Sequence, residues 1–136
     1  MKGLKAKVTR ALQVGSRVKV TDNSGAKIIE IVSVKKYKGV KGRLPKCGVG
    51  DVIMGAVKKG NPDVKHALLP CVIIRQKKEY RRKSGTRIKF EDNAAIVIKD
   101  LEKGEPKGTI IKGPVAREVV ERFPLVTRIS KMVVWW

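Results

Sequence analysis

Residues 69–98 read LPCVIIRQKKEYRRKSGTRIKFEDNAAIVI, a basic run between two apolar segments. Six of the nine residues at 75–83 are Lys or Arg, and Glu79 is the one acid among them. Buried charge without a partner costs several kcal/mol per ion, so we expect this run to face water or a polyanion. Ser84 and Gly85 then supply turn residues. The stretch therefore predicts a basic hairpin that projects from a β core.

Other short segments with strand character lie on both sides of this hairpin. Residues 17–20 alternate charged and apolar side chains, which is the period of a half-buried strand. Turns rich in Gly, Asn and Asp separate the segments. Several short strands with such turns predict a small closed or nearly closed β-barrel. The predicted strands are residues 16–21, 26–34, 50–57, 69–75, 86–90 and 94–98.

The last quarter of the chain has a different pattern. Gly113 followed by Pro114 predicts the start of a helix, because Pro is tolerated at the first helical position. We expect this helix to end near Phe123 and Pro124, with a second helical turn beyond it. The apolar end of the chain, residues 132–136, either packs on the body or takes part in a contact.

The net charge of the chain indicates an anionic partner. Its 136 residues include 32 Lys and Arg against 12 Asp and Glu, a net charge of +20. A free domain of this size has no structural use for that excess. With 42% hydrophobic residues the chain can bury a core, and its length favours one domain. We divide it into a basic N-terminal extension, residues 1–14, and a single domain, residues 15–136.

Several functional classes find little support. The longest apolar run without a charge, residues 67–74, is far shorter than the roughly 20 residues of a membrane span. Residues 1–10 contain no apolar stretch of signal-peptide length. Cys47 and Cys71 stand apart without a CxxC pair, so we expect reduced thiols in a cytosolic protein. Two such cysteines and one His do not make a zinc site, and no metal or cofactor is predicted.

Catalytic residues are equally scarce. His66 is the one imidazole, and a solvated or hydrogen-bonded His is the favoured interpretation over a general base. Glu91 and Asp92 are adjacent in a predicted turn, and we interpret them as turn residues. Residues 48–51 resemble part of a phosphate-binding loop but lack its full spacing, so a tight turn before a strand is favoured.

Two basic stretches predict binding to phosphates. The first, residues 35–46, contains Gly and Pro and no acid, which is typical of a flexible cationic loop. The second is the hairpin, where arginine can bond a phosphate through two nitrogens. The alternative for either stretch is a solvated basic face. The predicted RNA-binding residues are Lys35, Lys36, Lys38, Lys41, Arg43, Lys46, Arg75, Lys77, Lys78, Arg81, Arg82 and Lys83.

Aromatic residues make up 4% of the chain. Proteins that bind single strands stack bases on aromatic side chains, so this scarcity favours recognition of RNA backbone and shape over base reading. Tyr37 and Tyr80 lie in the basic stretches and could stack on a base or sugar. Phe90 is expected in the core. A folded, structured RNA suits this mode of binding.

Ordered motifs along the chain resemble one protein family. In residues 71–97, three aliphatic residues are followed, nine residues later, by Ser-Gly and then by Phe90, Asn93 and two more aliphatic residues. Cys71 stands where the family usually has Gly or Ala. Over residues 14–130 the chain resembles the universal large-subunit ribosomal protein number fourteen, in its archaeal and eukaryotic form. The other matching motifs are TDNSGA at 21–26, GVGD at 48–51 and GPV at 113–115.

The resemblance implies a fold and a role. The implied fold is mainly β, a small five-stranded β-barrel with a projecting β-ribbon and short C-terminal helices. The implied role is that of a structural constituent of the large subunit of the cytoplasmic ribosome, which binds large-subunit rRNA and helps form an intersubunit bridge with small-subunit rRNA. Neighbouring large-subunit proteins and an anti-association initiation factor are the other implied partners.

Residues 115–122 are less basic than the rest and suit a protein contact better than RNA. The predicted protein-contact residues are Val115, Glu118 and Arg122. The alternative is a helix that only closes the barrel.

Two rival functions share some of these features. A free nucleic-acid-binding module, such as a barrel that coats DNA or a translation factor, shares the charge but not the ordered motifs. An enzyme would need a pocket with perturbed titratable groups, which the sequence does not indicate. The sequence therefore favours a structural protein of the ribosome.

Overall fold

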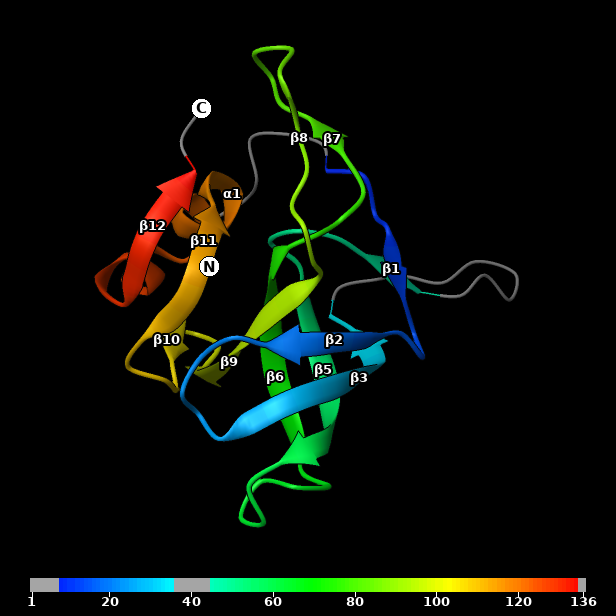
Figure 1. The fold of residues 1–136 in the computed structure, drawn as a ribbon, viewed down its shortest axis with the longest axis vertical. Coiled ribbons are helices and arrows are strands. Elements are labelled where there is room, and N and C mark those ends of the chain that lie inside the picture. The colour runs from blue at the N-terminus through cyan, green and yellow to red at the C-terminus, as the bar shows by residue number, and fades with distance from the viewer. Residues whose placement is uncertain (1–7, 36–44, 135–136) are drawn as a thin grey trace.

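The computed structural model describes residues 8–35 and 45–134. The barrel strands are β2 (Arg17–Val20), β3 (Ala26–Val34), β5 (Val52–Gly60), β6 (Leu68–Arg75) and β9 (Ala94–Asp100). They pair in the order β9, β2, β3, β5, β6, and β6 pairs again with β9, so the ring is closed (Figure 1). Neighbours are antiparallel except β2 and β9, which are parallel. The prediction of a small five-stranded β-barrel is confirmed.

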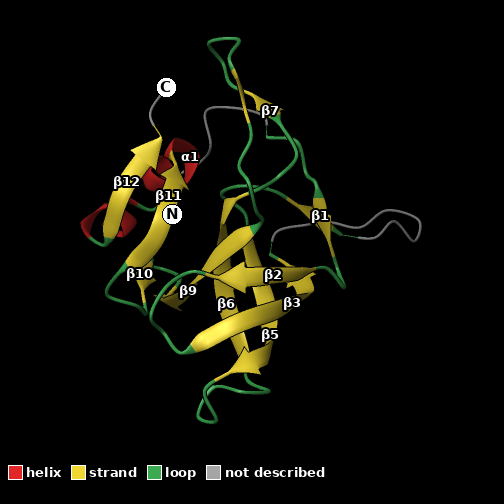
Figure 2. Cartoon of the chain, viewed as in Figure 1, coloured by secondary structure: helices red, strands yellow, loops and turns green. Residues whose placement is uncertain are grey.

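Shorter elements surround the barrel (Figure 2). Two strand pairs lie near the N-terminal segment and in the hairpin, and a parallel pair with two helical turns forms the C-terminal part. The pairs are β1 (Leu12–Gln13) with β4 (Lys46–Cys47), β7 (Tyr80–Arg81) with β8 (Arg87–Ile88), and β11 (Ile111–Ala116) with β12 (Ser130–Val134). The remaining elements are β10 (Glu105–Pro106), α1 (Arg117–Arg122) and the 3-10 helix η1 (Pro124–Arg128).

Each of the six predicted strands has a counterpart in the structure, but only the strand at 26–34 has the predicted bounds, and two of the differences have a clear cause. β5 continues three residues beyond the predicted end at 57, because Gly60 pairs with Ala26 at the start of β3. β8 keeps only two residues of the predicted strand 86–90. The N–H of Phe90 donates to the carbonyl of Gln76 at 3.1 Å, so the chain has already turned back to the barrel there.

The predicted helix start at Gly113 and Pro114 is wrong. Both residues lie in β11, where the register against β12 shifts between Ile111 and Pro114. Gly113 has a φ of +82°, a conformation that glycine adopts without steric cost and that interrupts regular pairing. The helix α1 begins three residues later. Its end before Phe123, and the second helical turn beyond it, agree with the prediction.

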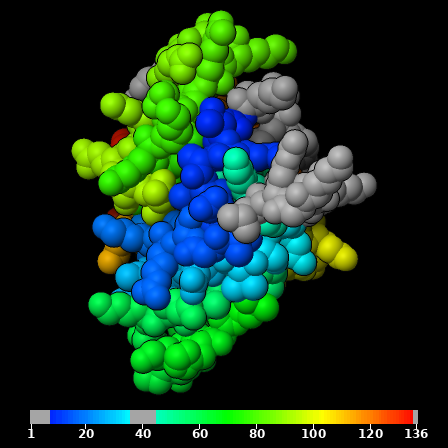
Figure 3. All heavy atoms as spheres, turned by 90° about the vertical axis from the view of Figure 1, so that its right-hand side faces the viewer, coloured from blue at the N-terminus to red at the C-terminus, as the bar shows by residue number. Residues whose placement is uncertain are grey.

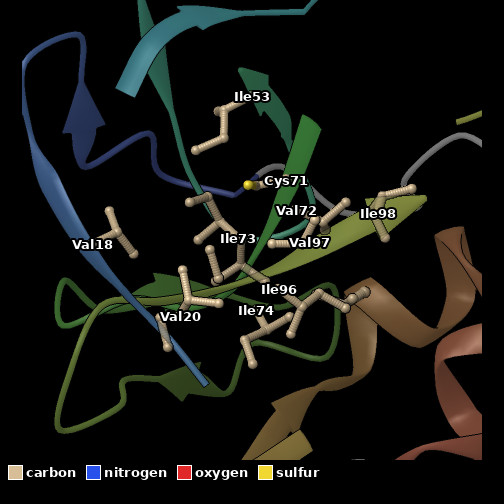
Figure 4. Close-up of a cluster of buried hydrophobic side chains, with 14 of the residues drawn as sticks. Val18, Val20, Ile53, Cys71, Val72, Ile73, Ile74, Ile96, Val97 and Ile98 are labelled. Carbon is tan, nitrogen blue, oxygen red and sulfur yellow. The ribbon is translucent and has the colours of Figure 1, made fainter. Parts of the chain in front are cut away.

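The core occupies the barrel and extends beneath the C-terminal elements. Successive residues of a strand point to opposite faces, so a fully buried run requires cover on both sides. Residues 71–74 of β6 and 94–98 of β9 are all buried. One face of these strands looks into the barrel, where Val18, Ile53 and Ile73 converge (Figure 4). β11 and α1 contact β6 from outside the barrel. Both faces of β6 and β9 are therefore buried.

Part of the predicted N-terminal extension lies on the barrel. Leu12 is buried and pairs with Cys47 of β4. In the space-filling view, the segment around residue 10 (blue) lies between the hairpin at the top and the barrel surface made by β2 and β3 (Figure 3). Residues 1–7 lie outside the described residues, and the division at residue 14 stays a prediction. Within residues 8–35 and 45–134, neither helical segment has the length and apolar character needed to cross a bilayer.

Candidate nucleic-acid interface

The basic hairpin, residues 76–90, leaves the barrel after β6 and returns just before β9 (Figure 1). β7 and β8 pair within it. The turn is closed by the N–H of Arg82, which donates to the carbonyl of Thr86 at 2.8 Å. Gly85 has a φ of +91°, which suits glycine because it has no Cβ. The predicted projecting hairpin is therefore present, with its turn where the sequence indicated.

The outer surface of the hairpin is strongly basic. Two of its cations, Arg87 and Lys89, were missed in the sequence analysis, although their alternation with the buried Ile88 is a strand signal that places them outward. Glu79 is the one acid of residues 76–90, and its carboxylate pairs with Lys78 Nζ at 3.2 Å. The exposed cations are Lys77, Lys78, Arg81, Lys83, Arg87 and Lys89.

Arg82 does not face water, and the expectation that the whole run does so is wrong at this residue. Its side chain is 1% exposed, and its Nε donates to Oε1 of Glu118 at 2.7 Å. Its Nη2 also donates to the carbonyl of Val134 at 3.1 Å. The hydroxyl of Tyr80 donates to the same carboxylate at 2.8 Å. This buried cluster joins β7 to α1 and β12.

Arg75 is also turned inward, so the expectation of a water-facing side chain is wrong here too. Its guanidinium forms two hydrogen bonds with the carboxylate of Asp92, at 2.9 and 3.3 Å. Its Nη1 donates to the carbonyls of Lys112 and Pro114, each at 3.0 Å. A Cβ on Gly113 would clash with Nη1. The bulge of β11 therefore needs glycine where the guanidinium passes.

Electrostatics within the cluster favour a charged Arg82 and a neutral Tyr80. Burial raises the pKa of Tyr80, and the negative charge of Glu118 raises it further. Burial lowers the pKa of Arg82, but the hydrogen bond and charge of Glu118 outweigh that effect and raise it overall. Tyr80 is fully buried, so its ring is not available to stack on a base.

Gln76 ties the start of the hairpin to the N-terminal segment. It is fully buried, and its Oε1 accepts a hydrogen bond from the N–H of Val49 at 2.9 Å. Its Nε2 donates to the carbonyls of Thr9 and Lys78. A Cβ on Gly48 would lie 2.7 Å from the Thr9 carbonyl oxygen and 2.8 Å from Gln76 Oε1. The close approach of three segments therefore explains glycine at position 48.

The turn motifs at residues 21–26 and 48–51 are each held by hydrogen bonds to an Asp carboxylate. Asp22 is buried and accepts hydrogen bonds from the N–H and hydroxyl of Ser24 and from the N–H of Val97 at 3.0 Å, which ties the turn to β9. Asp51 accepts from the N–H of Gly48 at 2.8 Å. The interpretation of residues 48–51 as a tight turn before a strand agrees with this geometry.

The predicted protein-contact residues are mostly internal. Val115 is fully buried, and Glu118 is 2% exposed inside the Arg82 cluster, so neither side chain offers a surface. Arg122 is partly buried, and its Nη1 donates to the carbonyl of Gly50 at 2.9 Å and lies 3.6 Å from Asp51. Arg122 joins α1 to the turn before β5 and Glu118 joins α1 to the hairpin, as expected for the alternative of a helix that closes the barrel.

The groups considered for catalysis are dispersed. His66 is exposed in the loop between β5 and β6, and its backbone N–H donates to the carbonyl of Val57. Asp92 is engaged by Arg75, so it does not form a pair with Glu91. Burial, followed by the charges of Asp51 and Asp22, raises the pKa of Cys47 and Cys71 to about 12. Both thiols therefore stay protonated and free at neutral pH.

The other predicted basic stretch is described only at its ends. Lys35 follows β3 and Lys46 lies in β4, and both are exposed. The remaining predicted residues of this stretch, together with Tyr37, lie outside the described residues. They are Lys36, Lys38, Lys41 and Arg43.

Comparison with known proteins identifies the family. The family described as Ribosomal protein L14p/L23e matches residues 11–134. A large ribosomal subunit protein uL14 of Methanocorpusculum labreanum is 53% identical over 134 residues, which is 98% of this chain and all of that protein. Proteins with the same name from Methanocella arvoryzae and Nanoarchaeum equitans are each 49% identical over the same shares of the two chains.

These matches settle the class of the protein. The relatives are archaeal, as the ordered motifs predicted, and they cover nearly the whole chain. The family consists of structural proteins of the large subunit of the cytoplasmic ribosome, and its members are not enzymes. The chain belongs to the ribosomal protein L14p/L23e family.

Proposed function

We propose that this ribosomal protein binds large-subunit rRNA through the outer surface of the basic hairpin. The observation that carries the proposal is the division of the cations at residues 75–89 into two sets. Arg75 and Arg82 are neutralised by Asp92 and Glu118 inside the protein. The six exposed cations described above face outward on the same hairpin. The first set fixes the hairpin on the body of the protein, and the second set is exposed to solvent, where it can contact phosphates.

The chemistry of the exposed set suits recognition of backbone and shape. Arg81 and Arg87 lie opposite each other across β7 and β8, so their guanidinium groups are close enough to contact neighbouring phosphates. Arginine binds phosphate through two parallel N–H bonds, whereas lysine acts as a point charge. With Tyr80 buried, the outer part of the hairpin made by β7, the turn and β8 offers no exposed aromatic ring. Its contacts are therefore expected to read phosphate positions in a folded RNA.

Residues 35–46 extend the same proposal. Lys35 and Lys46 are exposed at the two ends of this stretch. β4, which contains Lys46, pairs with β1 of the N-terminal segment, and Gln76 links that segment to the hairpin. The two basic stretches are thus joined through one set of contacts. Lys36, Lys38, Lys41 and Arg43 remain proposed phosphate contacts.

Further partners can be proposed from the family resemblance and from the exposed surface of the C-terminal elements. We propose contacts with neighbouring large-subunit proteins, an intersubunit bridge to small-subunit rRNA, and docking of an anti-association initiation factor. Because Val115 and Glu118 are buried, the proposed protein-contact surface moves to the exposed residues of β12. Met132 is 49% exposed there, beside the exposed Lys131. An exposed methionine suits a protein partner better than RNA.

Charge reversal tests the hairpin. The variant Arg81→Glu/Arg87→Glu and the control Lys59→Glu/Lys65→Glu have the same net charge, and the control residues lie at the opposite end of the barrel (Figure 1). Binding to the cognate rRNA fragment is measured at several salt concentrations. Each lost phosphate contact should make the slope of log affinity against log salt less steep by about 0.7–0.9. The hairpin variant should lose about two contacts, and an equal slope in both variants would remove the hairpin from the interface.

The C-terminal surface needs its own test. Met132→Asp places a charge in the exposed apolar position, whereas Thr127→Asp changes a nearby exposed polar residue. Binding of purified anti-association factor to large subunits that carry each variant is compared. We expect Met132→Asp to weaken factor binding at least tenfold and Thr127→Asp to change it less than twofold. Equal affinities in both would place the factor elsewhere.

A further inference from the structure

A cavity of about 620 Å³ opens beside the base of the hairpin. Its walls come from β2, the end of β6, the segment that leads from the hairpin into β9, and the bulge of β11. This volume lies within the roughly 300–1,000 Å³ of pockets that hold small ligands. The side chains that matter for its chemistry are Lys19, Arg75, Lys89, Phe90, Glu91 and Asp92.

Phe90 gives this cavity an aromatic wall. The described residues include three aromatic side chains, and two of them, Tyr80 and Phe123, are buried. Phe90 is partly exposed at the cavity, while the rest of its ring packs against the hydrophobic core. Its backbone N–H is held by Gln76. A ring fixed from behind and open in front is the kind of surface on which unpaired RNA bases stack.

The charged groups of the cavity divide into a paired and an exposed set. Arg75 and Asp92 neutralise each other through two hydrogen bonds. Lys19 and Lys89 are exposed and carry positive charge beside the ring. The backbone of Lys19 is held in place by its amide N–H, which donates to the carbonyl of Asn93. The two lysines can bind a phosphate while the neighbouring aromatic ring stacks on the base of the same nucleotide.

We propose that this cavity receives one unpaired nucleotide of the bound RNA, with its base against Phe90 and its phosphate between Lys19 and Lys89. The proposal rests on the rRNA-binding function and adds a contact with a base to a surface that otherwise meets the backbone. The exposed carboxylate of Glu91 repels a second phosphate and accepts hydrogen bonds from an amino group. Guanine, adenine and cytosine carry such a group, and uracil does not.

Nucleotide titration of the full chain tests this inference. The ¹⁵N-labelled protein is titrated with GMP and, separately, with ribose 5-phosphate, which has the phosphate but no base. GMP should shift the amide signals of residues 89–92 and Gly113 and bind at least about fivefold more tightly than ribose 5-phosphate. CMP should bind more tightly than UMP, and Glu91→Gln should reduce that difference.

Variants of the ring separate stacking from charge. Phe90→Leu keeps an apolar side chain in the core but removes the ring, so GMP should bind no better than ribose 5-phosphate. Phe90→Tyr keeps the ring and should retain the preference for GMP, which controls for damage to the fold. Lys65→Ala, in the loop at the opposite end of the barrel, should leave all affinities unchanged.

Two results would overturn the inference. One is equal affinity of the unaltered protein for GMP and ribose 5-phosphate, and the other is a preference for GMP that survives in Phe90→Leu. Either result is independent of the hairpin test, because Arg81 and Arg87 do not line the cavity. If the salt slope of rRNA binding depends on those arginines while GMP fails to bind, the cavity is rejected and the hairpin interface stands.

Discussion

The guanidinium of Arg82 and the carboxylate of Glu118 form a buried ion pair across 36 residues of sequence, with Nε and Oε1 2.7 Å apart. Through this pair, the hairpin that carries the exposed cations rests on the C-terminal helix. The same carboxylate accepts the hydroxyl of Tyr80, so two residues of the hairpin share one partner. The orientation of the outer surface therefore depends on a residue that never reaches it.

Removing one member of this pair should be strongly destabilising. Glu118→Gln leaves the Arg82 charge buried without its counterion, and such losses cost about 3–5 kcal/mol of unfolding free energy. Urea denaturation measures the change. Arg81→Met, at an exposed neighbouring position, serves as the control and should cost less than about 0.5 kcal/mol. The double variant Arg82→Met/Glu118→Leu should lose less than the sum of the losses in the single variants Arg82→Met and Glu118→Leu. Strict additivity would contradict the coupling.

Gly113→Ala should disturb Arg75. Position 113 has a φ of +82°, and an added Cβ would meet Nη1 of Arg75. The control is Gly85→Ala, where φ is +91° and nothing lies within 4 Å of the added atom. Backbone strain alone costs about 1–3 kcal/mol and affects both variants. Gly113→Ala should therefore lose more unfolding free energy than Gly85→Ala in thermal or urea denaturation. Equal losses would show that the guanidinium moves aside freely.

Asp22→Asn should loosen the junction of β2 and β9. One carboxylate oxygen accepts the N–H of Val97, and the other accepts both groups of Ser24. An amide has one acceptor oxygen, so at least one buried donor loses its partner at a cost of about 1–3 kcal/mol. Hydrogen exchange of the Val97 amide should accelerate. Asp63→Asn, in the exposed loop after β5, should leave exchange at Val97 unchanged. Unaltered protection in Asp22→Asn would mean that water replaces the carboxylate.

Stability should fall in alkali. The pKa of Cys47 and of Cys71 is raised by burial from 9.0 to about 12, so above pH 9 the unfolded chain releases protons that the folded protein retains. The contribution of the thiols to stability is fully present below pH 9 and is lost between pH 9 and 12. Each thiol lowers the unfolding free energy by up to about 1.4 kcal/mol per pH unit in that range. Urea denaturation from pH 8 to 10.5 measures this slope, and Cys71→Ala should make it shallower.

Local chemistry explains which parts of the fold could be predicted from the sequence. The strand at 26–34 is rich in β-branched residues and lies between turns, so both its existence and its bounds were predictable. The hairpin was visible because a basic run with Ser-Gly separates two apolar strands. The family motifs then supplied the barrel closure, which no single segment encodes.

Distant partners explain which parts could not. Arg75 and Arg82 look like their exposed neighbours in sequence, and their carboxylates lie 17 and 36 residues further along the chain. Glu118 was assigned to a surface for the same reason. Gly113 and Pro114 fit a helix start and a bulged strand equally well until the pairing with β12 is known. In each case a tertiary contact decided between two locally acceptable structures.

The carbonyl of Val134 as a partner of Arg82 has a consequence for the order of events during synthesis. Arg82 acquires its full set of partners only after 52 further residues have been translated and have left the exit tunnel. Glu118, which neutralises the guanidinium, follows Arg82 by 36 residues, so the inward orientation of Arg82 is unfavourable until that carboxylate has emerged. A nascent chain thus presents an immature hairpin, and the mature one forms once translation has passed β12. β12 therefore supplies the last contact that holds the Arg82 side chain inward.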